Sequence, residues 1–484
     1  MKIRRHSIKQ QDSSKESKSI KERIMDDFHH SSDLHCKSFE VPDIEITILF
    51  IADITNRKTI QKLIIAPLLF LAQENEPITP FSLTGKLPVE SMEVVKNYDK
   101  INTYLMDGFT IIIAKGETEV VYAIETCNFV KRKTNEPVNE PTISGPRDGF
   151  VESIQDNKSL IRMHLHSNDL VFERFAVGTE VKTYVELAYV KGKASEELIT
   201  EARERIQSVK AEYLGDAGLL EQAIGKNKFS AFPELTNTQF PLKVTNALME
   251  GKITILTDGS PTALIAPTTL NMLLQTPDDY YFKWIPASLT RILTYFAAII
   301  SFVLPAVYIS LISFHHGLIP TDLAISLSKT REGVPFPSVI EAFLMELTIE
   351  ILREAGIRLP KPIGSTVSIV GAIVIGETAV SAGIVSPMMV MVISFTAICS
   401  FTVPNYQLSL ALRSIRFFLL FFAAILGIYG ILIALFILST HLVSLRSFNV
   451  PYMEPFAPIR FRQLKDSVIR LFFRLGKKDG KLHE

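Results

Sequence analysis

The stretch Gly364-Ser-Thr-Val-Ser-Ile-Val-Gly-Ala-Ile-Val-Ile-Gly-Glu377 lies within a run of apolar and small residues that covers positions 363–385. A helix of about 20 such residues crosses the roughly 30 Å hydrocarbon core of a bilayer. Gly364, Ser368, Ala372 and Gly376 recur every four residues, so a helix places them on one smooth face. Such a face allows close packing, either inside one subunit or in a ring of identical helices around an axis.

Glu377 directly follows this face of small residues. An ionisable group at membrane depth marks a candidate functional site, and a ring of carboxylates favours cations. In a pore, Ala372 and Gly376 would set the width, and Ile373 or Val380 would act as apolar gates. The alternative is a polar contact between helices. The predicted pore-lining or gating residues are Gly364, Ser368, Ala372, Ile373, Gly376, Glu377 and Val380.

Other segments are also apolar and long enough to span a membrane. Together with the first stretch they predict an all-α membrane domain of about four transmembrane helices over residues 288–442. The predicted spans are 289–314, which contains Pro305, 363–385, 388–403 and 415–440.

Both ends of the chain are basic. Residues 1–37 are predicted to form a disordered tail, with contact to an anionic membrane face as the sharper alternative, and residues 443–484 form a second basic tail. Positively charged segments stay on the cytoplasmic side, so the soluble N-terminal region and the C-terminal tail are predicted there. This placement requires an even number of crossings, which four spans satisfy.

An amphipathic helix is predicted over 337–356, between the first two spans. Glu346, Glu350 and Glu354 are four residues apart and share one helix face. Acids on a lipid-facing span are costly, so we expect this face at the membrane surface or lining a water-filled vestibule. If the helix crossed the membrane as well, the count would be five and the C-terminus would lie outside.

The N-terminal part of the chain alternates strand and helix patterns. It predicts two α/β lobes, over 38–136 and 146–284, followed by the membrane domain. Ser195 is predicted to cap a long helix that follows the second lobe's strand pair. A turn is predicted at Asp258-Gly-Ser-Pro, between strands at 253–257 and 263–266.

Composition excludes several classes of protein. The 484 residues contain 51 Lys and Arg against 51 Asp and Glu, a balance that argues against binding to nucleic acid. The 3 cysteines have no zinc-type spacing and cannot form a disulfide framework. Known catalytic and nucleotide-binding motifs do not occur, so we expect no enzyme, no cofactor and no metal site.

A series of motifs resembles the A subunits of spore germinant receptors of the GerA type, over about residues 145–455 and in the same order. The motifs are Gly145-Pro-Arg-Asp-Gly-Phe-Val-Glu, Thr257-Asp-Gly-Ser-Pro, Pro277-Asp-Asp-Tyr-Tyr, Phe314-His-His-Gly-Leu-Ile-Pro, Gly333-Val-Pro-Phe-Pro, Ile349-Glu-Ile-Leu-Arg-Glu-Ala-Gly-Ile-Arg-Leu-Pro, Gly371-Ala-Ile-Val-Ile-Gly-Glu and Ser400-Phe-Thr-Val-Pro.

The resemblance implies an integral protein of the inner membrane of the bacterial endospore. Its expected partners are a multi-spanning, transporter-like B subunit and a C-subunit lipoprotein. The A subunit would oligomerise through its membrane domain into a nutrient-gated cation channel whose ion release starts germination. The alternative is a non-conducting scaffold or sensor that relays nutrient binding to the partners. A secondary transporter would need an internal repeat in the membrane region, and none is visible there.

Two positions depart from the family pattern. Family members also carry Gln where this chain has Glu377. The usual Ser-Phe-Gly-Val-Pro-Tyr is here Ser447-Phe-Asn-Val-Pro-Tyr. Since Asn tolerates a positive φ better than most residues, we expect the turn at Asn449 to be retained.

Overall fold

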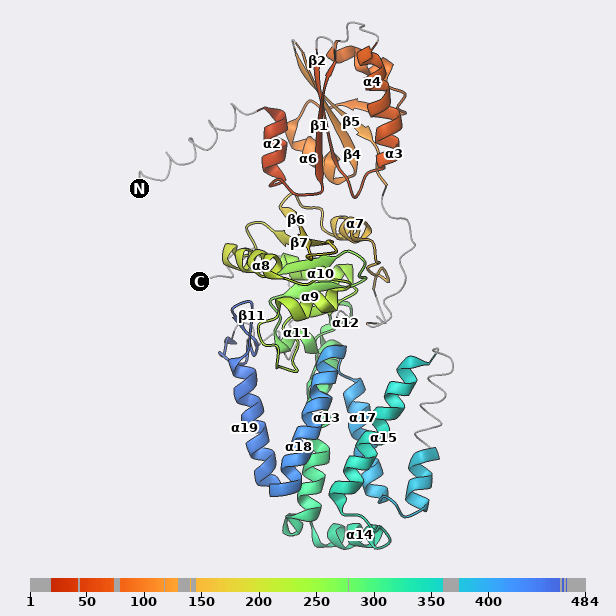
Figure 1. The fold of residues 1–484 in the computed structure, drawn as a ribbon, viewed down its shortest axis with the longest axis vertical. Coiled ribbons are helices and arrows are strands. Elements are labelled where there is room, and N and C mark those ends of the chain that lie inside the picture. Colours follow the sequence, from red (N-terminus) through yellow and green to blue (C-terminus); the bar gives the residue numbers. More distant parts are fainter. Residues whose placement is uncertain are drawn as a thin grey trace, which may run out of the picture. The chain divides into compact units, whose positions relative to one another are not determined.

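The computed structural model describes residues 19–41, 44–73, 79–116, 118–128, 140, 145–276, 278–359, 374–461, 464 and 467. The described residues form two compact units (Figure 1). The α/β unit lies within Met1–Pro141, Pro146–Lys226 and Leu235–Pro267. The helical unit lies within Thr142–Gly145, Asn227–Glu234 and Thr268–Glu484.

Lobe 1 of the α/β unit is an antiparallel sheet with helices on both faces. Along β4, Ile112 and Ala114 pack against η1 and α4, whereas Ile111 and Ile113 pack against α2 and α6. This alternation is what a strand buried on both faces requires. The strands, in the order β1-β2-β4-β5-β3, and the helices are β1 (Leu34–Val41), β2 (Ile44–Ile51), β3 (Met92–Val94), β4 (Phe109–Lys115), β5 (Glu119–Glu125), α2 (Ile20–Asp27), α3 (Arg57–Thr59), η1 (Ile60–Ile65), α4 (Ala66–Gln73), η2 (Pro80–Ser82), α5 (Leu83–Lys86) and α6 (Tyr98–Met106).

Lobe 2 repeats the topology of lobe 1. Its order β6-β7-β9-β10-β8 is the same permutation, and each lobe starts with a helix and carries another helix before its last strand pair. In both lobes the same four-residue pattern precedes the last strand pair: Leu, Met, an acidic residue and a glycine. The glycines, Gly108 and Gly251, both have positive φ. The elements are α7 (Ile154–His164), β6 (Leu170–Val177), β7 (Thr183–Val190), α8 (Glu196–Ser208), α9 (Ala217–Ile224), β8 (Thr236–Thr238), α10 (Pro241–Met249), β9 (Ile253–Thr257) and β10 (Ala263–Ala266).

The predicted fold class is confirmed: two α/β lobes precede a helical region with apolar helices. Local predictions hold as well. The Ser195 side chain accepts a hydrogen bond from the Leu198 N–H and caps α8. β9 and β10 pair across the turn that contains Gly259, whose φ is 82°.

The predicted disordered tail over 1–37 differs from the structure in its second half. Ser19 and Glu22 form a capping box that starts α2, and β1 begins at Leu34. Ile24 and Phe28 are fully buried in the core of lobe 1. The high lysine content of this region obscured an amphipathic helix whose apolar residues are four apart. That spacing places them on one face, and burial of this face stabilises the helix. Residues 1–18 lie outside the described part of the chain.

The helical unit contains two helices that are long and apolar enough to cross a membrane, α13 and α18, and two shorter apolar ones, α17 and α19. The predicted span 289–314 corresponds to α13, which continues through Pro305. The elements are α11 (Leu270–Leu274), α12 (Asp278–Tyr281), α13 (Trp284–Ser313), η3 (His316–Leu318), α14 (Thr321–Arg331), α15 (Ser338–Arg358), a helix over 374–381, α17 (Pro387–Phe401), α18 (Tyr406–Leu426), α19 (Ile428–Ser444), β11 (Arg446–Ser447) and β12 (Val450–Pro451).

Contacts at the helix termini fix how the helices run. We call the end of the bundle where α13 begins the first end and the opposite end the second end. The hydroxyls of Ser313 and Ser338 lie 2.6 Å apart, so α15 starts at the second end. Arg353 bonds to Ser400 near the ends of α15 and α17, which are therefore parallel. α18 then returns to the second end and α19 to the first (Figure 1).

The predicted single span over 415–440 is instead two antiparallel helices. α18 ends at Leu426, Gly427 has a φ of 57°, and α19 runs back along α18. A side chain on Gly430 would place its Cβ 2.0 Å from the Phe422 carbonyl oxygen, so glycine is what allows this tight reversal. The sequence is apolar on both sides of the turn, and for that reason hydropathy alone merges the two helices.

The segment after α19 is described continuously through Phe461 and belongs to the helical unit. Phe448 and Asn449 have φ values of 45° and 64° and form the two-residue turn between β11 and β12. The expectation that Asn449 retains the turn is confirmed. Tyr452, just after the turn, is fully buried in the apolar core that α13, α18 and α19 share.

Candidate functional site in the helical unit

A buried ionic junction joins the two lobes of the α/β unit. Arg162 on α7 donates from Nε and Nη2 to the Asp33 carboxylate, at 2.8 and 3.1 Å. Lys158, one turn earlier, lies 2.9 Å from Asp53 Oδ2 and 3.2 Å from Glu186 Oε1. Burial acts to raise the pKa of Asp33, but Arg162, Lys158 and the Ser31 hydroxyl together outweigh it and hold this pKa below its ordinary value. The junction therefore couples the lobes through charges that are costly to separate.

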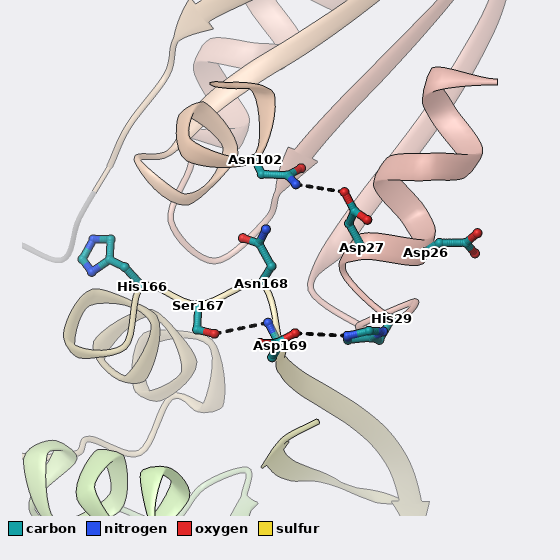
Figure 2. A pocket seen from close by; sticks show the side chains of 8 residues that line it. All are labelled: Asp26, Asp27, His29, Asn102, His166, Ser167, Asn168 and Asp169. Atoms are coloured by element: carbon teal, nitrogen blue, oxygen red, sulfur yellow. Dashed lines mark hydrogen bonds and ion pairs between the residues drawn. The ribbon is translucent and has the colours of Figure 1, made fainter. Parts of the chain in front are cut away.

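A pocket of about 710 Å³ lies beside this junction, between the lobes (Figure 2). Asn102 of α6 donates to Asp27 at 2.9 Å on one side. His29 contacts Asp169 across the lobes at 3.4 Å. Three carboxylates, including that of Asp26, line the pocket, so it favours polar or cationic groups over anions.

Two acids of α15, Glu346 and Glu350, pair with arginines of α18 and form the centre of a polar column. Glu346 accepts from Arg416 Nη1 at 2.6 Å, and both side chains are buried. One turn closer to the first end, Glu350 pairs with Arg413. Partners of opposite charge thus allow α15 to carry acids inside an apolar bundle.

The column continues at both ends of α15. Arg353 donates to Ser400 Oγ at 2.9 Å at the end of α17. At the second end, fully buried Glu341 accepts from Arg331 at 2.7 Å. Its other oxygen accepts from the N–H and hydroxyl of Ser386, at 3.0 and 2.9 Å, at the start of α17. The column ties α15 to three neighbouring segments.

Part of the column's hydrogen-bonding capacity is unused within the described residues. Glu346 Oε1 and the Nε and Nη2 atoms of Arg416 are buried without a partner there. Buried polar atoms of this kind are normally satisfied by protein or by ordered water. A water molecule at the centre of the column would therefore supply the partners that these atoms lack among the described residues.

The three predicted vestibule residues lie in three different environments in the structure. Glu346 is buried against Arg416, and Glu350 is half-buried against Arg413. Glu354 is exposed and pairs with Arg358 of the same helix, with Oε1 2.6 Å from Nη2. Sequence reasoning did not identify Arg413 and Arg416. The signal was present, because two arginines in the middle of an apolar helix need buried partners and four acids on the amphipathic helix α15 need cations.

The predicted pore-lining residues fall partly on the described chain. Gly364, Ser368, Ala372 and Ile373 lie outside the described residues. Gly376 is buried and faces Val390 on α17, where an added Cβ would lie in ordinary van der Waals contact, 3.6 Å from Cγ1. Val380 is partly buried in the core formed with α13 and α17. Glu377 is exposed on the surface of the unit.

Among the described residues, no group of three or more His, Cys, Asp or Glu has an arrangement that could hold a metal ion. Cys36, Cys127 and Cys399 are free thiols.

Comparison with known proteins places this architecture in a family. The family model for Bacillus/Clostridium GerA spore germination proteins matches residues 22–481. Spore germination protein A1 of Bacillus subtilis (strain 168) is 40% identical over 401 residues, 83% of this chain and 83% of that protein. Spore germination protein GerLA of Bacillus cereus is 38% identical over 427 residues, 88% and 86% of the two chains. The membrane protein YfkQ of Bacillus subtilis (strain 168) is 37% identical over 423 residues, 87% and 82% of the two chains. The chain therefore belongs to the GerA family of spore germination proteins, the germinant receptor A subunits, and is a membrane protein with a role in spore germination.

Proposed function

We propose that this chain is the A subunit of a nutrient receptor in the inner membrane of the endospore, and that its copies assemble into a germinant-gated cation channel. Ion release through the channel would initiate germination. The expected partners are a transporter-like B subunit and a C-subunit lipoprotein, and the chain acts as a receptor subunit rather than an enzyme. Membership in the GerA family supports this role.

Glu377 is the observation that carries the channel proposal. Its carboxylate is exposed on a helix whose neighbours Val374 and Ile375 are exposed apolar residues. An exposed carboxylate on an apolar membrane surface is costly in lipid, so it must face water or another copy of the chain. In a symmetric oligomer both needs are met when Glu377 repeats as a ring around an aqueous axis.

The direction of the helices supports a revised topology with six crossings. α13, α15, α17, α18 and α19 each run between the two ends of the bundle. α15 ends at the first end and α17 begins at the second, so we assign the sixth crossing to the predicted span 363–385, of which residues 363–373 lie outside the described part of the chain. Pairing with Arg413 and Arg416 removes the objection to a crossing by α15. Six is even, so both termini remain on one side, which we assign to the cytoplasmic core of the spore.

Gating requires two arrangements of the helices that bind a ligand or partner differently. We assign the moving contact to the column between α15 and α18, where Arg416 and Glu346 keep unpaired buried atoms. A shift of α15 by one turn towards the second end would bring Glu350 to Arg416 and Glu354 to Arg413, because Glu346, Glu350 and Glu354 repeat every four residues, and it would release Glu346 from its arginine.

Charge reversal at Glu377 tests the channel. Spores with Glu377→Lys should release potassium far more slowly on nutrient addition than wild type, at equal protein level, because a ring of ammonium groups repels cations. Glu377→Gln should fall between them. Asp322→Lys, at an exposed position of α14, is the matched control and should leave release unchanged. Normal potassium release in Glu377→Lys spores would refute a pore at this position.

A non-conducting scaffold is the second candidate. The packing of Gly376 against Val390 of the same chain favours it, since this part of the small-residue face serves a contact within one subunit. A scaffold predicts that Glu377→Lys changes assembly with the partner subunits while the purified chain carries no current.

A further inference from the structure

A tight turn at residues 227–234 belongs to the helical unit, although the chain on both sides of it belongs to the α/β unit. The turn is held by its own hydrogen bonds. The Asn227 N–H donates to Glu234 Oε1 at 2.8 Å, and the Ser230 N–H donates to the Asn227 carbonyl at 3.0 Å. It is therefore a formed element with a defined tip, at Lys228 and Phe229.

The turn is attached to the last turn of α19. Ser230 Oγ lies 3.0 Å from His441 Nε2, and the Phe232 ring contacts the rings of His441 and Tyr452. Ser447, just beyond α19, donates to the Glu234 carbonyl at 2.6 Å. His441 lies three residues before Ser444, which is about 5 Å along a helix axis. The tip is thus fixed at the level where α19 leaves the apolar part of the bundle.

The composition of the tip fits the boundary of a membrane and does not fit the interior of a protein. Phe229 is 106% exposed, the largest exposure among the described large apolar side chains, while its neighbour Phe232 is buried. Lys228 beside it is exposed. An aromatic ring next to a basic residue is the pairing that inserts at the border of acyl chains and anionic headgroups.

The same combination recurs elsewhere at the first end. Phe461 and Ile459 are exposed on both sides of Arg460, and this segment contacts the first half of α13 through the Phe456 and Tyr295 rings, whose centroids are 6.1 Å apart. Trp284, the first residue of α13, is also exposed. Exposed aromatic and basic residues therefore occur at further sites towards the first end of the bundle.

We propose that the tip Lys228-Phe229 is a membrane anchor, with the Phe229 ring in the interfacial layer of the bilayer and Lys228 on anionic headgroups. The anchor gives the loop between the lobe 2 elements α9 and β8 a direct contact with lipid. It fixes this loop to the same leaflet as the end of α19. It goes beyond the proposed channel, because it needs only that the helical unit lies in a membrane.

The chain has a single tryptophan, Trp284, so single-tryptophan variants report the depth of chosen sites. In the Trp284→Phe background, Phe229→Trp places the probe at the tip, and Phe81→Trp places it at a 66% exposed site in lobe 1. The full chain is reconstituted in vesicles of phosphatidylcholine and phosphatidylglycerol. Wild-type Trp284 provides a reference for the first end, and circular dichroism verifies the fold of each variant.

The tip tryptophan should emit at shorter wavelength than the Phe81→Trp probe. Iodide should quench its fluorescence at least about threefold less, because a ring inserted several ångströms into the interface is shielded from the aqueous quencher. Lipids brominated near the headgroup should quench it more than lipids brominated near the chain end. Iodide quenching equal to that of Phe81→Trp would overturn the proposal. So would protection that arises only when partner subunits are added, because the occupant would then be a protein.

Discussion

Removing the charge of Glu346 should destabilise the helical unit strongly. In Glu346→Gln the Arg416 guanidinium remains buried with its nearest counter-charge gone. Breaking a buried pair in this way costs about 3–5 kcal/mol. For a unit of this size each kcal/mol lowers the unfolding midpoint by about 2–4 °C, so we expect a loss of about 10 °C.

Cys399 provides the assay. Its thiol on α17 is 6% exposed, close to the column, and reacts with a maleimide dye only when the helical unit opens. In a Cys36→Ser, Cys127→Ser background, labelling against temperature in detergent gives the midpoint. Glu354→Gln is the matched control, because Glu354 and its partner Arg358 are exposed, and such pairs contribute about 0.5 kcal/mol.

A double variant separates the pair from the individual side chains. Glu346→Met with Arg416→Met removes both charges and should recover most of the loss, because apolar replacement of a buried pair is often neutral. Equal midpoints for Glu346→Gln and Glu354→Gln would refute the buried pair. A double variant as unstable as the sum of the single ones would refute the coupling.

Three further predictions concern other parts of the chain. The stability that Asp33 adds to the lobe junction should be present above about pH 4 and should be lost as the pH falls through its lowered folded-state pKa. Asp33→Asn should remove that part of the acid unfolding transition, which circular dichroism of the isolated α/β unit measures. Gly430→Ala should lower the Cys399 labelling midpoint sharply, whereas Gly317→Ala, where an added Cβ meets nothing within 4 Å, should leave it within a few degrees. Asn449→Val should cost about 1–2 kcal/mol in the same labelling assay because its φ is 64°, and Asn449→Gly should be neutral or stabilising.

Local signals in the sequence were sufficient for much of the fold. The hydroxyl of Ser195 before a helical pattern, the Asp258-Gly259 turn and the tolerance of Asn449 for positive φ each act within a few residues, so the sequence reveals them directly. The duplication of the lobes also left a short sequence match, Leu-Met followed by an acid and a glycine, which ends at Gly108 and at Gly251. A match of four residues does not indicate a duplication by itself, and it does so here only because the strand order is also the same.

Long-range effects explain what sequence reasoning missed. Whether an acid on α15 faces lipid, water or an arginine depends on which helix packs beside it, and the partners Arg413 and Arg416 are more than 60 residues away. The reversal at Gly427 is hidden because both flanking helices are apolar. Lys158 and Arg162 read as ordinary surface residues of an amphipathic helix, and only the approach of the two lobes makes them a buried junction.

The central claim is that copies of this chain enclose a path for cations at Glu377. Single-channel recording of the purified chain in planar bilayers tests it most directly. The account predicts discrete cation-selective currents in wild type, and currents that lose cation selectivity or vanish in Glu377→Lys. A correctly folded wild-type chain that inserts in the bilayer and carries no current, or a current whose selectivity Glu377→Lys does not change, would contradict it.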